Sequence, residues 1–457
     1  MSFLGLDIAL SGLRAQQYAM DVTAHNIANA GTAGYHRQVA VLVSGNGASA
    51  SAGEIYGQLG TGVIIQGVRR MQSEYIGDQV RTATQWLGMW NSKNEALTQV
   101  ESIFSEPGDS GLAATMDQFW NSWQDLSTSP ADTVARISVV ENGVALSDRI
   151  RGLYRDLRGL QATTDRDIVD NTTQVNRLAH EIAALNNDIS EAKGTGGEPN
   201  DLMDRRDLLL NELANIADIQ TNGDNASELI VAINGKVLIQ GNKVTEVAVT
   251  QDADGWSRII WSNDGSPVEI SGGEIAGQIQ VRDDLIEGYI QSLDTIARTI
   301  VDRVNALHST GVTSDGQPAG NFFTANSGAA DMSVESTIAS DPSGVATSTT
   351  GQSGDNSLAR AIAAVADEKL IGGETIGSAY SGLIARLGAN TRAAGSSVDL
   401  HTASLQQLKT QGESLSGVSL DEEMLNMVKF QQAYNAAARV ITVLNDMLDT
   451  LMNQAGA

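Results

Sequence analysis

Histidine, aspartate and glutamate are the side chains with which metal or acid–base chemistry could start here, because the chain contains no cysteine. The five histidines stand at positions 25, 36, 180, 308 and 401, and no two of them have the spacing of a metal-binding pair. His180 and Glu181 begin like the H-E-x-x-H helix of zinc proteases, but Ala184 occupies the place of the second histidine. We therefore expect a pair of residues on a helix surface and no metal site.

Two groups of charged residues could also carry chemistry. Residues 421–423 are Asp-Glu-Glu and could hold a cation, and "LMDRRDLLLNELA" at 202–214 could hold an acid–base pair. The first group stands in the first turn of an expected helix, where negative charge opposes the positive end of the helix dipole. In the second, Asp and Arg alternate beside a leucine stripe, which is typical of a salt-bridged solvent face. We expect the structural role for both groups.

Tryptophan pairs are a third candidate, because aromatic side chains on one helix face can line a ligand groove. The pairs stand three or four residues apart and are more often core: Trp86 with Trp90, and Trp120 with Trp123. Neither G-x-S-x-G nor G-x-x-x-x-G-K-[ST] occurs, and "GTGGEP" at 194–199 separates two expected helices, so it indicates a turn. We predict that the chain is not an enzyme and takes no cofactor.

The two ends of the chain carry a heptad pattern of apolar side chains, which is the seam of a coiled coil. Steps of four and three residues connect the positions of the first seam, with Gln17 as its polar member: Leu6, Leu10, Leu13, Gln17, Met20, Ala24 and Ile27. The second seam follows Ser419 and Glu422, which form a capping box for the last helix: Phe430, Tyr434, Ala437, Ile441, Leu444, Leu448 and Leu451. Two such stripes predict either mutual packing or packing on neighbouring copies.

Between these ends the pattern predicts a nested, multidomain α+β chain. Short β segments are expected over 38–69, helices over 70–193 with breaks at "EPGDSG" and "STSP", and a further helix over 203–216. Residues 217–270 alternate with period two and contain two hairpin turns, at Asn234-Gly235 and Asp254-Gly255. Helix returns over 275–308 and 356–415, around an irregular Gly/Ser/Thr-rich stretch at 309–355.

Three domains follow from this pattern. Residues 1–37 with 418–457 form an inner unit of paired terminal helices, 38–216 with 271–417 form a mainly helical unit of long helices, and 217–270 form an inserted outer β domain. Because the chain leaves and returns along one path, we expect the termini at one end of the molecule and the β insertion at the other.

Composition limits the partners. The net charge of -26 argues against nucleic acid, since phosphate binding needs a basic surface. No apolar run approaches the length of a membrane span, so no membrane insertion is expected. The first basic residue is Arg14, and Asp7 interrupts the only apolar stretch before it, so we expect no secretory signal peptide and an export route that needs none.

Several stretches together resemble one family. "SGLRAQQYAMDVTAHNIANAGTAGYHRQ" resembles the N-terminal motif of bacterial flagellar rod, hook and hook-associated axial proteins, and Arg37-Gln38 after Gly34-Tyr35 favours the hook-associated protein 1 branch. Further stretches are similar to that branch in order: "LMDRRDLLLNELA", "GGEIAGQIQVRD", "VNALHSTG", "GNFF" and "GVSLDEEMLNMVKFQQAYNAAARVITVLNDMLDTLM". The chain departs from the family at Ala33, where a proline is frequent, and its middle is short for some members.

The resemblance implies a structural adaptor between the flagellar hook and the filament, exported unfolded by the flagellar type III route to the extracellular flagellum. It implies as partners the hook protein, a second, filament-side hook-associated protein, copies of the chain and an export chaperone at the C-terminal helix. Two alternatives stay open. One is another axial component, hook or distal rod protein, and the other is a secreted hydrolase on the same scaffold, which would need a catalytic group within 217–270.

The turn after the first helix completes the prediction. Asn and Gly residues follow the first seam at the point where its helix must end: Asn26, Asn29, Gly31, Gly34 and Tyr35. We expect this segment to be an elbow that takes the chain from the inner helices to the helical domain. We also expect residues 1–40 and 418–457 to be mobile in the free monomer and to order on assembly, because an isolated helix is marginal in water.

Overall fold

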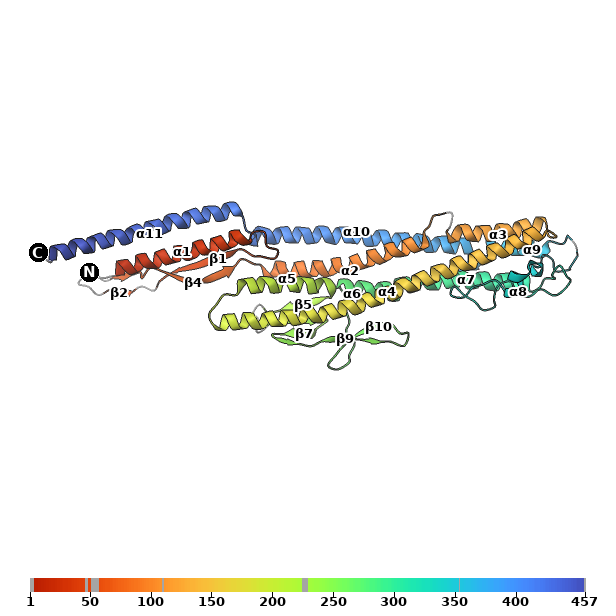
Figure 1. Ribbon diagram of the computed structural model, residues 1–457, viewed down its shortest axis with the longest axis horizontal. Coiled ribbons are helices and arrows are strands. Elements are labelled where there is room, and N and C mark those ends of the chain that lie inside the picture. Colours follow the sequence, from red (N-terminus) through yellow and green to blue (C-terminus); the bar gives the residue numbers. More distant parts are fainter. Residues whose placement is uncertain are drawn as a thin grey trace.

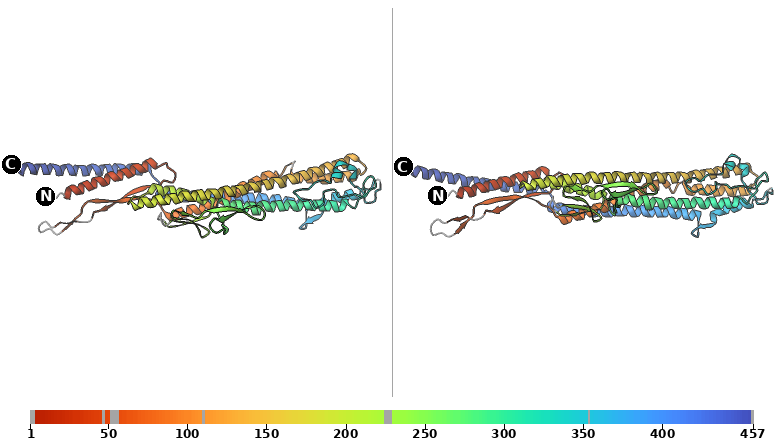
Figure 2. Two further views of the ribbon diagram at one scale, coloured as in Figure 1. Left: turned by 60° about the horizontal axis from the view of Figure 1, so that its bottom comes forward. Right: turned by 90° about the horizontal axis from the view of Figure 1, so that it is seen from below.

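The computed structural model describes residues 4–45, 48–50, 57–108, 111–223, 229–352 and 354–455. They form a long rod made mostly of helices, with both chain ends at the same end of the molecule (Figure 1). Two further views show the same elongated shape from other sides (Figure 2). None of the described helices is long and apolar enough to cross a membrane.

The end that carries the termini consists of two helices and a β-hairpin. Helix α1 (Leu4–Asn29) packs along α11 (Leu420–Ala455), and the two run antiparallel. A Cβ on Gly5 would lie 3.6 Å from Leu444 Cδ1, and Asn26 hydrogen-bonds Glu423. Strands β1 (Gln38–Ser44) and β4 (Val63–Arg70) pair antiparallel and pack on α1. The hairpin continues into the short pair β2 (Ala48–Ala50) and β3 (Gly57–Leu59).

Long helices build the rest of the rod, and contacts connect them side by side along its length. They are α2 (Glu74–Phe104), α3 (Leu112–Thr128), α4 (Thr133–Gly194), α5 (Asn200–Ile216), α6 (Gly273–Gln280), α7 (Glu287–His308) and α10 (Ile376–Ser416). The two breaks predicted within 70–193 are confirmed, between α2 and α3 and between α3 and α4. The described residues form two hydrophobic cores along the rod. At 62 residues, α4 spans about 90 Å and contributes side chains to both.

We call the core shared by α3, α7 and the "GNFF" segment the outer core. It is rich in aromatic side chains, although aromatic residues are only 4% of the chain. Trp123 of α3 and both phenylalanines of the "GNFF" segment are fully buried there. Asn305 of α7 holds that segment: its Oδ1 accepts from the backbone N–H groups of Phe322 and Phe323 at 2.9 and 2.8 Å. His308, one turn later, donates from Nδ1 to the Gly320 carbonyl at 2.7 Å.

The predicted β region is confirmed as strands, with both hairpins. A four-stranded antiparallel sheet and a two-stranded pair contain β5 (Ile219–Asn222), β6 (Ile230–Ile233), β7 (Lys236–Gln240), β8 (Lys243–Val244), β9 (Val247–Gln251) and β10 (Ser257–Trp261). Asn234 and Gly235 both have positive φ, as a type I′ turn needs.

The position of this β region differs from the prediction. It lies beside the middle of the rod and not at the end opposite the termini (Figure 1). Its apolar side chains, such as Val231 and Ile239, share a core with Leu178 of α4 and Leu213 of α5. The reason is that α4 continues past the insertion point, so the rod extends beyond the sheet in both directions.

Two segments expected to be plain helix contain other structure. A hairpin of β11 (Lys369–Ile371) and β12 (Glu374–Thr375) interrupts 356–415, and Gly372 and Gly373 have positive φ at its turn. A π-helical segment, η1 (Val281–Ile286), separates α6 from α7. The Gly/Ser/Thr-rich stretch at 309–355 is irregular as predicted, apart from the short helical turns α8 (Ser336–Ser340) and η2 (Pro342–Gly344). The predicted helical segment after it begins with α9 (Ser357–Ala363) and η3 (Ala364–Asp367), which precede the hairpin.

Candidate assembly surface and its polar junction

Helix α1 buries mainly small side chains. Ala15, Ala19, Thr23 and Asn26 are at most 3% exposed and follow one another at helical spacing. The larger apolar residues of the predicted seam are less covered: Leu6, Leu13, Met20 and Ile27 are half-buried, and Leu10 is 37% exposed. The described chain therefore covers one side of α1 with its own hairpin and α11, and leaves apolar surface beside it.

Helix α11 is open to solvent along most of its length. The seam residues Phe430, Tyr434, Ile441, Leu444 and Leu448 are all half-buried, and the side chain of Leu451 lies outside the described residues. Other large apolar side chains of α11 are about half exposed or more: Leu420, Met424, Leu425, Val428, Val440, Val443, Met447 and Met452. Such a density of exposed apolar residues marks an interaction surface.

The predicted elbow is a tight turn. Helix α1 ends at Asn29, whose Nδ2 donates to the carbonyl oxygen of His25 at 3.1 Å, and Thr32 donates to Asn29 Oδ1. Gly34 has φ of +76°, a left-handed conformation that favours glycine, whereas Gly31 lies in open space. The chain then enters β1, which runs back along α1 before the hairpin returns to the rod, so the elbow is followed by a reversal.

Asn26 is the centre of a polar junction at this turn. Its side chain is 1% exposed and makes four hydrogen bonds. Oδ1 accepts from the Tyr35 hydroxyl at 2.7 Å and from the Gln38 N–H at 2.9 Å. Nδ2 donates to the Gln38 carbonyl at 2.8 Å and to Glu423 Oε2 at 3.0 Å. The full capacity of one amide thus connects α1, the elbow, β1 and α11.

Glu423 is the residue that sequence reasoning assigned only to the helix dipole. Its side chain is 2% exposed, whereas neighbouring Glu422 is 68% exposed. Besides Asn26, it accepts from Arg37 Nε at 2.7 Å. The Arg37 backbone N–H donates to the carbonyl of Ser416, the last residue of α10. Only the burial of Glu423 separates it from its acidic neighbours, so its sequence position gave no signal of this role.

The Asp- and Arg-rich part of α5 completes the junction and corrects the prediction of a solvent face. Asp204 and Arg206 are 6% and 3% exposed. Asp204 accepts from the His36 backbone N–H at 3.0 Å, contacts His36 Nδ1 at 2.6 Å, and pairs with Arg70 of β4 at 2.8 Å. Arg70 also pairs with Asp207 at 2.6 Å. Asp204 is buried because the elbow and β4 cover its face of α5, whereas Arg206 points to α4 and donates to Asn186 Oδ1 at 3.2 Å.

Tyr35 takes part in the junction as a neutral hydrogen-bond donor. Its ring lies edge-on to His25, with centroids 5.6 Å apart. Burial raises the pKa of its hydroxyl above the ordinary value. Three carboxylates add to this rise in the pKa: Asp201, Asp204 and Glu423. The hydroxyl therefore keeps its proton at all physiological pH values.

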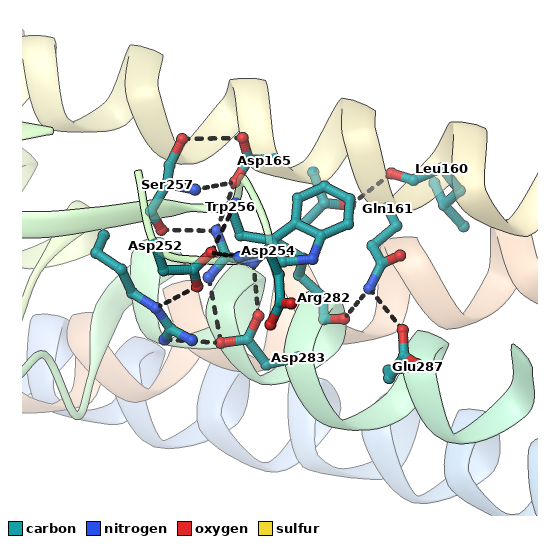
Figure 3. A network of polar contacts seen from close by, with 12 residues as sticks. Leu160, Gln161, Asp165, Asp252, Asp254, Trp256, Ser257, Arg282, Asp283 and Glu287 are labelled. Atoms are coloured by element: carbon teal, nitrogen blue, oxygen red, sulfur yellow. Dashed lines mark hydrogen bonds and ion pairs between the residues drawn. The ribbon is translucent and has the colours of Figure 1, made fainter. Parts of the chain in front are cut away.

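A second buried network joins the β region to the rod, around Arg282 of the π-helical segment (Figure 3). Arg282 is fully buried. Its Nη1 pairs with Asp165 of α4 at 2.5 Å and donates to the Ser257 carbonyl of β10 at 2.8 Å, and its Nε pairs with Asp283. Burial opposes the charge, but the bonds to both carboxylates outweigh it and raise the pKa of Arg282.

A cleft of about 640 Å³ lies over this network. Its charged lining is largely paired within itself: Arg258 bonds Asp252 and Asp283, and Arg158 bonds Glu287. The hydrolase alternative required a catalytic group within 217–270. Asp252, which lines the cleft from this segment, pairs with Arg258 and accepts from the backbone N–H groups of Asp254 and Trp256. No group of three or more His, Asp or Glu among the described residues could hold a metal ion.

The remaining candidates from the sequence are His180 and the tryptophans, and their outcomes differ. His180 pairs with Glu246 at 2.8 Å on an exposed surface, and not with Glu181, which pairs with Arg177. The core interpretation of the tryptophans is confirmed for Trp120 and Trp123, which are buried. It is wrong for Trp86, which is 44% exposed and stacks on His401.

Three family models match the chain. They are described as the flagellar hook-associated protein FlgK helical domain, over residues 97–323, the flagellar basal body rod FlgEFG protein C-terminal region, over 413–454, and the flagella basal body rod protein, over 6–36. The last two cover the terminal helices and the elbow. The first covers most of the rod and the β region.

Curated relatives match over almost the full length. Flagellar hook-associated protein 1 of Bacillus subtilis is 32% identical, with 100% of this chain and 99% of the relative covered. The Salmonella typhimurium protein of the same name is 25% identical, with 97% and 98% covered. The first alignment spans 514 positions against 457 residues here, so the relative contains residues that this chain lacks.

One solved structure shares the fold. The flagellar hook junction protein FlgK from Burkholderia pseudomallei aligns with a TM-score of 0.50 at 22% identity, covering 54% of this chain and 46% of that one. The relatives named above are structural proteins of the flagellum. The extent and identity of these matches show that this chain belongs to the flagellar hook-associated protein 1 family.

Proposed function

We propose that this chain is the structural adaptor that joins the flagellar hook to the filament, and that its terminal helices are the surface by which it assembles. The family assignment supports the role. The observation that carries the assembly surface is the exposure of apolar side chains along α11, where Val440, Val443 and Met447 are each at least half exposed. A solvated surface of this kind is stabilised when neighbouring subunits cover it.

We assign one role to each of the three domains expected from the sequence. Residues 1–37 with 418–457 form the inner unit, in which the seam and the elbow act. Residues 38–216 with 271–417 form the helical rod, and 217–270 form the outer β domain. The packing of β1 and β4 on α1 supports adding this hairpin to the inner unit.

The partners follow from the same surface. The hook protein, the filament-side hook-associated protein and further copies of this chain would cover the apolar faces of α1 and α11. Before assembly, an export chaperone would cover α11, and the chain would pass the flagellar export channel unfolded to its extracellular site. The exposed apolar residues of α11 and the absence of cysteine support this sequence of events.

A charge in the seam tests the proposal. Leu444 faces α1 beside Gly5, so Leu444→Asp should prevent incorporation, because a carboxylate cannot be buried there without a partner. In cells that lack the native protein, we expect intact hooks without filaments, and flagellin released to the medium. The rod should keep its thermal unfolding transition.

Asn445→Asp is the matched control, since it adds the same charge at the next, exposed position. It should support filaments. Normal filaments with Leu444→Asp, at normal export levels, would remove the seam from the proposal. Absence of hooks would favour the alternative of a hook or rod component.

A further inference from the structure

We infer that Asn26, Arg37 and Glu423 form a register lock, which selects one alignment of α11 against α1 among several that the apolar seam would allow. The inference goes beyond the adaptor role, because it concerns how a single chain aligns its own ends. Its starting point is the contrast between a repetitive apolar contact and one buried polar group at its end.

The apolar contact alone specifies register weakly. The seam of α11 repeats every seven residues, so a shift by one heptad, about 10 Å, again places an apolar residue opposite α1. The most deeply buried apolar residues of α1 are alanines, and Gly5 lies against Leu444, so small residues of α1 can accept partners of different size. Antiparallel helices with such faces can slide between alignments of similar free energy.

The register lock gives the alternative alignments of α11 against α1 different free energies. A shift by one heptad toward the C-terminus would place Phe430 where Glu423 stands. Arg37 Nε would then lose its carboxylate acceptor, and Asn26 Nδ2 would keep only the Gln38 carbonyl. A buried N–H that loses an acceptor and a charged group that loses its partner both raise the free energy of the shifted alignment. A buried polar residue in an apolar helix pair is known to fix register in this way, with little gain in stability.

The lock also fixes the direction in which the helix pair leaves the rod. Only Gly417, Val418 and Ser419 connect α10 to α11. The Arg37 N–H donates to the Ser416 carbonyl at 2.8 Å and the Met71 N–H donates to the Arg37 carbonyl at 2.8 Å. One residue of the elbow therefore holds the end of α10 by its backbone and the start of α11 by its side chain.

Distance measurement between spin labels tests the lock in the full chain, which has no native cysteine to interfere. Asp21→Cys on α1 and Asn445→Cys on α11 are both exposed. From the observed pairing of Gly5 with Leu444 and Asn26 with Glu423, the labelled positions are offset by about 25 Å along the helix axis. We expect one dominant distance in the labelled parent chain.

Glu423→Leu removes the acceptor and should move part of the population by about 10 Å, the length of one heptad, while the start of α11 rearranges to accommodate the shift. Glu423→Gln keeps a hydrogen-bond acceptor and should shift a smaller fraction. Glu422→Gln removes the same charge from the exposed neighbour and should leave the distribution as in the parent.

Three outcomes would overturn the inference. They are a parent chain without a dominant distance, a Glu423→Leu chain with the parent distribution, and a Glu423→Leu chain whose helices separate without any defined distance. The last would show that the polar group supplies affinity between the helices and not register. Filament assembly does not enter these readouts, so the inference and the proposed function fail independently.

Discussion

The terminal helix pair and the outer half of the rod are both helical, but they are stabilised differently. In the outer rod, large side chains such as Trp123, Phe322 and Ile300 are fully buried. In the terminal pair, the buried apolar residues are alanines, and large apolar ones such as Leu425 and Met452 are 70% or more exposed. One region completes its core within the chain, and the other leaves large apolar side chains exposed, which we propose that neighbouring subunits cover.

This difference separates folding from assembly. A rod with a closed core can fold before it meets its partners. Terminal helices with solvated apolar faces would gain further burial when neighbours cover them, so we propose that assembly stabilises a helix pair that the chain itself covers only in part. Polar networks connect the regions at both transitions, at Asn26 for the terminal pair and at Arg282 for the β region.

Hydrogen exchange should show the largest contrast. In dilute monomer, amides of α1 and α11 should exchange about a hundredfold or more faster than those in the middle of α4 and α7. Mass spectrometry of proteolytic fragments after timed labelling measures this. Full protection of both terminal helices in the monomer would break the comparison, because their order would then owe nothing to neighbours.

Truncating a buried aromatic should destabilise the rod strongly. Trp123→Ala should lower the free energy of unfolding by about 4 kcal/mol, because it leaves a large cavity among Phe119, His308 and Phe322. Denaturant titration followed by circular dichroism measures the change. The matched control is Trp86→Ala on α2, which should cost about 1 kcal/mol or less, since Trp86 is 44% exposed. Equal costs would contradict a closed outer core.

The ion pairs at the β region should differ according to burial. Arg282→Met should cost about 3 kcal/mol, because Asp165 and Asp283 would lose their buried partner. Arg258→Met removes a half-exposed arginine that pairs with Asp283 and Asp252, and should cost less than about 1 kcal/mol. Unfolding of each variant in urea gives these values. If Arg282→Met left the free energy of unfolding unchanged, the buried ion pairs of Arg282 would not stabilise the attachment of the β region to the rod.

Acid should lower the free energy of unfolding through protonation of His308, and we expect a smaller effect than that of the substitutions above. Burial lowers the pKa of this imidazole, although the hydrogen bond to Gly320 opposes the shift. Nε2 accepts from the Ala346 N–H at 3.1 Å, so it must stay unprotonated. The unfolded chain therefore binds the proton more tightly, and stability falls as pH decreases below about 6.5, by at most about 1.4 kcal/mol per pH unit.

Comparing urea unfolding at pH 7.5 and 5.5 measures this slope, and His308→Gln should remove part of it. The variant keeps one donor and one acceptor but does not titrate. An unchanged slope in His308→Gln would assign the acid sensitivity of the outer core to other groups.

The pattern of apolar residues predicted much of the secondary structure. Breaks at "EPGDSG" and "STSP", the turn at Asn234-Gly235 and the start of α11 after Ser419 all have local causes, in turn or capping residues. The strands β11 and β12 and the π-helical segment were missed. The π-helical segment is in contact with Gln161 of α4, which donates to the Arg282 carbonyl at 2.8 Å over a separation of 121 residues.

Some residues of the candidate site were predicted from the sequence and others were not. Heptad spacing predicted the seam residues of α11, of which Leu444 lies against Gly5 of α1, and Asn26 and Gly34 belong to the predicted elbow. The roles of Glu423 and Asp204 were not predictable, because acidic residues in a first helical turn or in an Asp-Arg repeat are ordinarily solvated. Their burial results from the elbow and β4 covering them.

The sequence by itself determined the helices, the hairpin turns, the absence of disulfides and the apolar stripes, because periodicity, capping and turn chemistry act over a few residues. Only the tertiary structure decided that the β region lies beside the middle of the rod, that α1 buries its small residues, and that Asn26, Arg37 and Glu423 meet. Those features depend on contacts between segments up to 397 residues apart, for which a single sequence carries no local signal.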